Sequence, residues 1–267
     1  MDKGRIKLPE NELKTRLLEG RVVLGTILNS PGDYQLLYVL SNAGVDFAFV
    51  DMEHGPAGLE TVCNLVLHAR AANISLLIRV PDMQYPYITR LLDNGAQTLL
   101  VPHLRTPAEA EQAVELAYYH PLGRRGMAMG WTPATGFGQV TDIPAATEHA
   151  NSSLLLGVNI ETKEAVGSLD QMLIPGIGFA IVGYADLAQT YGIPGQYQDR
   201  LIVDAKKAVS GLCRSRGIYY LEVARTPDQF SALIEQGAQM ILYGGVHAFA
   251  AAAADSAVQA LEKLRRG

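Results

Sequence analysis

The stretch Asn94-Gly95-Ala96-Gln97-Thr98-Leu99-Leu100-Val101 recurs in altered form as Gln236-Gly237-Ala238-Gln239-Met240-Ile241-Leu242-Tyr243. Each copy has the pattern of a helix end, a glycine suited to the left-handed conformation that follows it, and a short apolar strand. The two copies lie about half the chain apart. We therefore interpret them as two turns of one strand–helix architecture rather than as the short period of a solenoid.

Short apolar runs of the same kind occur along the whole chain and alternate with helical patterns. They are nearly continuous in apolar residues, which is typical of parallel strands buried on both faces. The eight runs are Val22–Leu28, Phe47–Val50, Ser75–Val80, Thr98–Val101, Leu154–Ile160, Phe179–Val182, Tyr219–Val223 and Met240–Tyr243. Apolar residues at spacings of three and four predict helices over Tyr34–Ala43, Leu59–Ala71, Tyr87–Asn94, Pro107–Tyr118, Asp199–Arg216, Pro227–Gln236 and Val246–Leu264.

Eight strands with intervening helices favour an α/β fold of the closed (β/α)8 TIM-barrel type. An open, doubly wound sheet is the alternative. The length of 267 residues suits one barrel, so we predict a single domain over residues 1–267. The longest irregular stretch is predicted over Tyr119–Ser153, which holds the only tryptophan, Trp131. A loop of this length is expected to cover the site or to meet a neighbouring subunit.

The composition excludes several classes of protein. The formal net charge is −5, and Lys263, Arg265 and Arg266 form the only basic cluster, so a nucleic-acid partner is not expected. Cys63 and Cys213 are far apart and no CxxC motif occurs, which argues against a disulfide framework or a zinc ribbon. Neither an apolar leader nor an apolar run of membrane-spanning length is present, so we expect a cytoplasmic protein without a membrane partner.

Charged residues follow four of the apolar runs at the point where each run ends. In a parallel barrel the carboxyl ends of the strands surround one opening, where catalytic residues lie. The residues predicted to share this opening are Asp51, Glu53, His54, Arg79, Glu161 and Asp186.

Two carboxylates at one opening suggest a divalent-cation site, completed by water and substrate oxygens. The carboxylates available for this site are those of Asp51, Glu53, Glu161 and Asp186. His54 is the candidate general base, since an imidazole exchanges protons near neutral pH. Arg79 offers a fixed cationic donor for a carboxylate or a developing oxyanion.

Simpler roles remain open for single members of this group. Asp186 could merely cap the helix that follows it. Arg79 could merely neutralise Asp51 or Glu53, which are predicted to support the site from behind. His103 is the only other histidine expected near the opening, and we interpret it as a surface or packing residue.

Other catalytic motifs fail. A dinucleotide fingerprint would need glycine where Ile181 follows Gly176 and Gly178, so no nucleotide cofactor is expected. Neither a phosphate-binding P-loop nor a serine nucleophile elbow occurs in the chain. Lys163, at a predicted helix start, is a poor candidate for a Schiff base.

Taken together, six segments resemble the HpcH/HpaI aldolases, which are metal-dependent class II pyruvate aldolases with a TIM-barrel fold. The resemblance runs in the family's order from about Gly25 to the C-terminal helix. The segments are Asp51–Pro56, Ile78–Pro81, Leu92–Pro102, Tyr119–Gly126, Ile160–Thr162 and Ala185–Leu187.

The resemblance implies a role for each site residue. Glu161 and Asp186 correspond to the two ligands of a Mg²⁺, Mn²⁺ or Co²⁺ ion. His54 corresponds to the base, paired with Asp93. Arg79 would hold the pyruvate oxygens and stabilise the enolate.

The resemblance also implies how substrate and subunits are held. Backbone amides from Gly183 to Asp186, including that of Ala185, would bind the pyruvate carboxylate. The family forms hexamers, as trimers of dimers, with exchanged C-terminal helices, which fits the Ala-rich end of this chain.

Three positions depart from the family pattern. Asn159 stands where glutamine is usual, so its shorter amide would reach the metal-bound water or the substrate less well. Tyr184 replaces the usual proline, which would reshape the carboxylate pocket. The Met127–Thr132 segment lacks the family's serine-containing loop and carries Gly130 and Trp131.

The expected reaction is cleavage of a 4-hydroxy-2-oxo acid to pyruvate and an aldehyde through a metal-stabilised enolate. Oxaloacetate decarboxylation on the same site is the alternative enzymatic reading. A coenzyme A lyase would need basic groups for the coenzyme tail, and the sequence offers no such cluster. A barrel that binds a keto acid without catalysis is the alternative of a different class.

Overall fold

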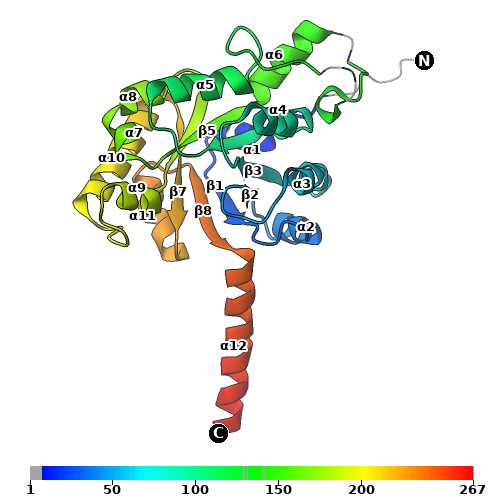
Figure 1. Ribbon diagram of the computed structural model, residues 1–267. Coiled ribbons are helices and arrows are strands. Elements are labelled where there is room, and N and C mark those ends of the chain that lie inside the picture. The colour runs from blue at the N-terminus through cyan, green and yellow to red at the C-terminus, as the bar shows by residue number, and fades with distance from the viewer. Residues whose placement is uncertain (1–7, 129, 131, 141, 267) are drawn as a thin grey trace.

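Eight parallel strands form a closed barrel in which each strand pairs with the next in the chain and the last pairs with the first (Figure 1). This computed structural model describes residues 8–266 apart from 129, 131 and 141. The closed barrel confirms the predicted TIM-barrel class and rules out the open sheet. The strands are β1 Val23–Ile27, β2 Phe47–Asp51, β3 Ser75–Arg79, β4 Thr98–Val101, β5 Leu155–Ile160, β6 Ile177–Val182, β7 Tyr219–Ala224 and β8 Met240–Gly245.

Helices follow the strands and surround the barrel (Figure 1). Sequence capping signals set several of their ends: Thr106 and Glu109 form a reciprocal capping box at the start of α5. The main helices are α1 Glu12–Leu18, α2 Gln35–Asn42, α3 Leu59–Ala71, α4 Tyr85–Asp93, α5 Pro107–Ala117, α6 Ile143–Ser153, α9 Tyr184–Thr190, α10 Arg200–Arg216, α11 Phe230–Glu235 and α12 Val246–Arg266. Shorter turns are η1 Pro133–Thr135, α7 Lys163–Gly167, α8 Leu169–Met172 and η2 Pro227–Gln229.

The two copies of the repeated phrase adopt the predicted conformation. Gly95 after α4 has a φ of 95°, and Gly237 after α11 has a φ of 104°. Both values lie in the left-handed region, where a side chain would be strained. Each glycine thus reverses the chain at a helix end and directs it into β4 or β8.

Aromatic side chains fill the barrel interior. Phe47 and Phe179 are fully buried inside the barrel, and each lies against a strand glycine. A Cβ atom at Gly25 would come within 2.2 Å of the Phe47 ring, and one at Gly157 within 2.2 Å of the Phe179 ring. The interior is therefore a packed core, and chemistry is confined to the rim formed by the strand ends.

The predicted irregular stretch Tyr119–Ser153 was wrong in part. Its second half contains α6, and Thr135 of the short turn η1 is buried. Asp142 caps α6 by accepting a hydrogen bond from the Ala145 amide at 3.0 Å, a signal that the sequence prediction overlooked. Trp131 lies outside the described residues.

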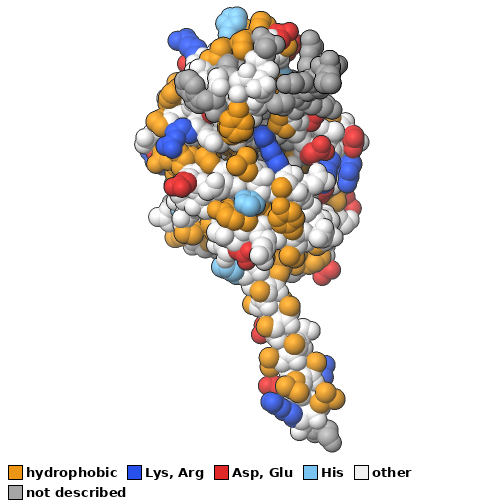
Figure 2. Space-filling model, turned by 90° about the vertical axis from the view of Figure 1, so that its right-hand side faces the viewer, with side chains coloured by type: hydrophobic (Ala, Val, Ile, Leu, Met, Phe, Trp, Pro, Cys, Tyr) orange, Lys and Arg blue, Asp and Glu red, His pale blue; other side chains and the backbone are white. Residues whose placement is uncertain are grey.

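Helix α12 leaves the barrel and extends away from it as a stalk (Figure 1). Hydrophobic side chains lie along this stalk (Figure 2), and among them Val258, Leu261 and Leu264 are exposed. Within the part of the chain that the structure describes, no helix is both long and apolar enough to cross a membrane.

Candidate active site at the barrel mouth

Strand register brings the charged residues of β2 and β3 side by side. Asp51 and Arg79 are the last residues of their strands and are direct neighbours in the parallel pair. Arg79 donates from Nε to Asp51 Oδ1 at 2.9 Å and from Nη2 to Oδ2 at 2.7 Å. Its Nη1 lies 2.7 Å from Glu53 Oε2, so one guanidinium bridges two carboxylates.

The contacts that Arg79 makes with Asp51 change the pKa of this carboxylate. Burial by itself would raise the pKa of Asp51, but the hydrogen bonds and charge of Arg79 outweigh it and hold that pKa below its usual value. Arg79 therefore forms the ion pairs with Asp51 and Glu53 that were considered for it from the sequence. Two of its five N–H groups donate hydrogen bonds to Asp51, and Nη1 forms an ion pair with Glu53, which leaves part of the guanidinium for a substrate oxygen.

A second cluster shares Glu53 with the Arg79 ion pairs and joins it to His103 and Glu161. His103 Nε2 lies 2.5 Å from Glu53 Oε1, and its Nδ1 lies 3.3 Å from Glu161 Oε1. The His103 amide also donates to Glu161 Oε1 at 2.6 Å. One ligand atom from each of the three residues lies within 4.8 Å of the others, a spacing that suits a shared metal ion.

Glu161 is the most perturbed acid of this group. Its side chain is fully buried, and burial raises its pKa to about 7. The negative charges of Glu53 and Asp186 act in the same direction, while the amide and ring of His103 oppose them. A buried carboxylate near other carboxylates is stabilised when a cation binds it, so the donor set fits a divalent metal.

Asn159 and Gly183 enclose Glu161 on its other side. Asn159 is buried, and its Nδ2 donates a short hydrogen bond to Glu161 Oε2, while its Oδ1 has no hydrogen-bond partner among the described residues. A Cβ atom on Gly183 would lie 2.5 Å from Glu161 Oε2 and 2.8 Å from Asn159 Oδ1. Asn159 thus contacts the candidate metal ligand, and Gly183 leaves the space that this carboxylate needs.

The predicted roles of Gly183 and Ala185 differ in this structure. The Gly183 amide already donates to the Ile160 carbonyl at 3.1 Å, so it is not available for a substrate carboxylate. Ala185 lies in the first turn of α9, where amides have no partner within the helix. Asp186 lies in the same turn, and its charge reaches Glu161.

The predicted pair of His54 and Asp93 is not formed within this chain. The His54 side chain is 62% exposed, with its Nε2 4.0 Å from Glu53 Oε2. Asp93 instead accepts a hydrogen bond from Arg125 Nη2 at 2.7 Å. The correction has a topological cause: Asp93 ends α4 on the outside of the barrel, whereas His54 follows β2 at the rim.

His103 is the site residue that the sequence prediction missed. The prediction made it a surface or packing residue, yet it contacts both Glu53 and Glu161. Its left-handed φ of 57° is uncommon outside glycine and aids this placement. The criterion that selected Asp51 and Glu161, a polar residue just after a strand, applies equally to His103 after β4.

Comparisons with known proteins point to one family. Residues 28–253 match the family model described as HpcH/HpaI aldolase/citrate lyase. The chain is 35% identical over 192 residues, 72% of its length, to the pyruvate aldolase of Rhizobium etli, of which the match covers 74%. It is 30% identical to the 2-keto-3-deoxy-L-rhamnonate aldolase of Escherichia coli, with 89% of this chain and 88% of that protein covered.

A solved structure agrees. The HpcH/HpaI aldolase/citrate lyase family protein of Burkholderia cenocepacia superposes with a TM-score of 0.86 and 28% identity. The superposition covers 94% of this chain and 99% of that one.

Proposed function

The chain belongs to the HpcH/HpaI aldolase/citrate lyase family, and we propose that it is a divalent-metal-dependent aldolase that cleaves a 4-hydroxy-2-oxo acid to pyruvate and an aldehyde. The observation that carries the proposal is the buried Glu161 carboxylate at the rim, with a pKa of about 7 and other carboxylates around it. The aldolase names of the relatives from Rhizobium etli and Escherichia coli support the reaction class.

We assign the metal to Glu161 and Asp186: Glu161 lies in one group of possible ligands with Glu53 and His103, and the charge of Asp186 acts on Glu161 from the first turn of α9. Carboxylate and water oxygens suit Mg²⁺ or Mn²⁺, and an imidazole ligand would also suit Co²⁺. When bound, such an ion supplies a Lewis acid that polarises the keto group of the 2-oxo acid. Asn159 would then orient Glu161 through its hydrogen bond to Oε2.

The remaining residues would hold the substrate around this centre. The N–H groups of Arg79 that do not donate to Asp51 can bind an oxygen of the 2-oxo acid and stabilise negative charge that develops on it. The first-turn amides of α9, Ala185 among them, can bind the carboxylate. Asp51 keeps the Arg79 guanidinium in place through its two hydrogen bonds.

His54 is the candidate base for the proton of the 4-hydroxyl group. Its exposed ring at the rim can reach a substrate that enters from solvent. Removal of that proton allows the C3–C4 bond to break, which releases the aldehyde and leaves the pyruvate enolate to be protonated.

Oxaloacetate decarboxylation is the second candidate, and one observation favours it. His54 has no carboxylate within hydrogen-bond distance in the described chain, so its role as a base lacks the expected Asp93 support. Decarboxylation passes through the same enolate but requires no base at a 4-hydroxyl group.

The exposed helix α12 supports an oligomer. A helix that carries Val258, Leu261 and Leu264 into solvent is expected to bury them against another copy. We propose a hexamer built as a trimer of dimers with exchanged α12 helices, each subunit being one barrel domain over residues 1–267.

One assay separates these functions. The metal-stripped protein is reloaded with Mn²⁺ or Mg²⁺ and given racemic 4-hydroxy-2-oxo acids or oxaloacetate, while pyruvate is followed by a coupled reaction. Pyruvate release that requires metal and is lost in Glu161→Ala supports the aldolase. Pyruvate release that continues at the same rate in the presence of a chelator contradicts the metal proposal. Pyruvate release from oxaloacetate alone favours the decarboxylase.

A further inference from the structure

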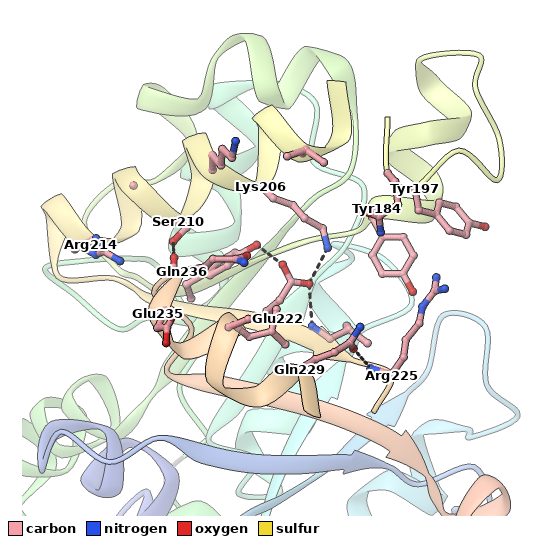
Figure 3. Close-up of a pocket in the computed structure, with 18 residues that line it drawn as sticks. Tyr184, Tyr197, Lys206, Ser210, Arg214, Glu222, Arg225, Gln229, Glu235 and Gln236 are labelled. Atoms are coloured by element: carbon pink, nitrogen blue, oxygen red, sulfur yellow. Dashed lines mark hydrogen bonds and ion pairs between the residues drawn. The ribbon is translucent and has the colours of Figure 1, made fainter. Parts of the chain in front are cut away.

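A cleft of about 650 Å³ lies outside the barrel, between α10 and α11 (Figure 3). Its floor is the outer face of β7, because Glu222 faces the cleft whereas Leu221 packs inside the barrel. One end of the cleft reaches the rim of the barrel, at Tyr184, the first residue of α9, and at Arg225, which follows β7. A volume of this size lies within the range of small-molecule sites.

The cleft is basic although the chain as a whole is acidic. Its lining carries Lys206, Lys207, Arg214 and Arg225 against only two carboxylates, while the chain has a net charge of −5. Among the described residues, no carboxylate forms an ion pair with the side-chain nitrogens of Lys207, Arg214 or Arg225. The cleft therefore holds positive charge that the protein does not neutralise.

The floor of the cleft is a built polar network. Glu222 is 3% exposed, and its oxygens contact Lys206 Nζ at 2.9 Å and the Tyr220 hydroxyl at 2.6 Å (Figure 3). The Val223 amide donates to the same carboxylate at 2.9 Å. These contacts hold the ammonium group of Lys206 on the cleft floor, and within the described part of the chain one of its three donors is used.

Lys206 and Arg225 both lie near the Tyr184 ring, at one end of the cleft. Lys206 Nζ lies 4.9 Å from the centre of the Tyr184 ring, and the Arg225 guanidinium lies 5.9 Å from it. Arg225 also lies 5.7 Å from the Tyr197 ring, which packs edge-on against Tyr184 (Figure 3). Glu222 compensates Lys206, whereas Arg225 has no such carboxylate partner among the described residues.

We propose that this cleft is a second ligand site, beside the barrel mouth, that binds a small organic dianion through Arg225 and Lys206. A guanidinium presents parallel donors that match the oxygens of a phosphate or carboxylate group. The rings of Tyr184 and Tyr197 lie near the Arg225 guanidinium and favour its position at this end of the cleft. Phosphate monoesters and dicarboxylates share the required chemistry.

Isothermal titration calorimetry of the full-length, metal-loaded protein tests the proposal. The probes are inorganic phosphate, glycerol 3-phosphate and malonate, with uncharged glycerol as the negative control. We expect at least one anion to bind with a Kd below about 1 mM and glycerol not to bind. Binding of both phosphates but not malonate would identify a phosphate site, and the reverse would identify a dicarboxylate site.

Matched variants locate the bound anion. Arg225→Gln removes the uncompensated cation that lies beside the Tyr184 and Tyr197 rings and is expected to weaken binding at least about tenfold. Arg200→Gln is the control, since Arg200 lies on α10, is exposed and pairs with Asp204 outside the cleft lining. It is expected to change the Kd less than about twofold. Lys207→Gln provides a second variant at an exposed position in the lining.

Three results would overturn the proposal. The first is the absence of binding by every anion. The second is binding that survives Arg225→Gln but is lost in Arg79→Lys, which would place the anion at the barrel mouth. The third is a protein that binds none of the anions and whose oligomeric mass, measured by light scattering, changes in Arg225→Gln. The cleft would then be a contact between subunits.

Discussion

Replacement of Glu161 by glutamine is expected to stabilise the metal-free protein at alkaline pH while abolishing metal binding. The folded protein raises the pKa of this group from 4.5 to about 7, chiefly through burial. At 1.36 kcal/mol for each pKa unit, keeping the carboxylate ionised in the fold costs about 3 kcal/mol. Glutamine cannot ionise, so the variant avoids this cost.

Hydrogen bonds at the site can adapt to the new amide. The amide oxygen can still accept from the His103 amide, which lies 2.6 Å from Glu161 Oε1. The amide nitrogen would face Asn159 Nδ2, but Asn159 can rotate its side-chain amide and offer Oδ1, which is unpartnered in the present structure. Asn159 therefore keeps one partnered and one unpartnered polar atom, since its Nδ2 takes the place of the unpartnered Oδ1.

The sign of the pH dependence follows from the direction of the shift. Because the folded state favours the protonated acid, the stability that Glu161 contributes is present below pH 4.5 and is lost as the pH rises through about 7. The advantage of Glu161→Gln should thus be about 3 kcal/mol at pH 8 and about half of that at pH 5.5.

Urea denaturation of both proteins at the two pH values, in chelator, measures this difference. Added Mn²⁺ is the control, since it should stabilise the original protein and leave the variant unchanged. A variant that is less stable than the original at pH 8 without metal would refute the reasoning, because it would show that the ionised carboxylate is well paired in the fold.

Metal affinity, catalysis and assembly can each be tested in the same way. The apparent Kd for Mn²⁺ should fall about tenfold for each pH unit between pH 5 and 6.5 and level off above about pH 7, because Glu161 must lose its proton before it can bind the ion. Calorimetry that shows the same Kd at every pH would contradict the role of Glu161 as a ligand. Arg79→Lys should lower kcat/KM about 100-fold in the pyruvate assay, because a lysine cannot bridge Asp51 and Glu53 together. An unchanged kcat/KM would show that Arg79 has no role in the reaction. Removal of residues 250–267 should reduce the oligomeric mass in light scattering while circular dichroism shows a folded barrel, and an unchanged mass would contradict helix exchange.

The sequence by itself determined the barrel and its rim. Runs such as Thr98–Val101 are apolar without alternation, as strands buried on both faces must be, and the glycines at 95 and 237 mark the helix ends. Because the carboxyl ends of parallel strands meet at one opening, the position of Glu161 just after an apolar run was enough to assign it to this rim. Membership of the HpcH/HpaI family agrees with the motifs that carry these assignments.

The tertiary structure alone decided how the rim residues are partnered. Strand register made Arg79 the partner of Asp51, and the left-handed turn after β4 placed His103 between Glu53 and Glu161. Partners so distant in the chain leave no periodic signal, because side-chain contacts at a rim depend on loop conformation rather than on spacing.

The cleft on the outer face of β7 shows the same difference between what the sequence determines and what the packing determines. Apolar neighbours predicted Tyr219–Val223 as a strand, but only the packing of α10 against it revealed that Glu222 is buried beside Lys206. A buried charge is stable only where a partner reaches it, and that partner lies on another element. The sequence therefore determined which elements form, while their packing determined which charges are compensated and which, like Arg225 within the described chain, are left to a ligand.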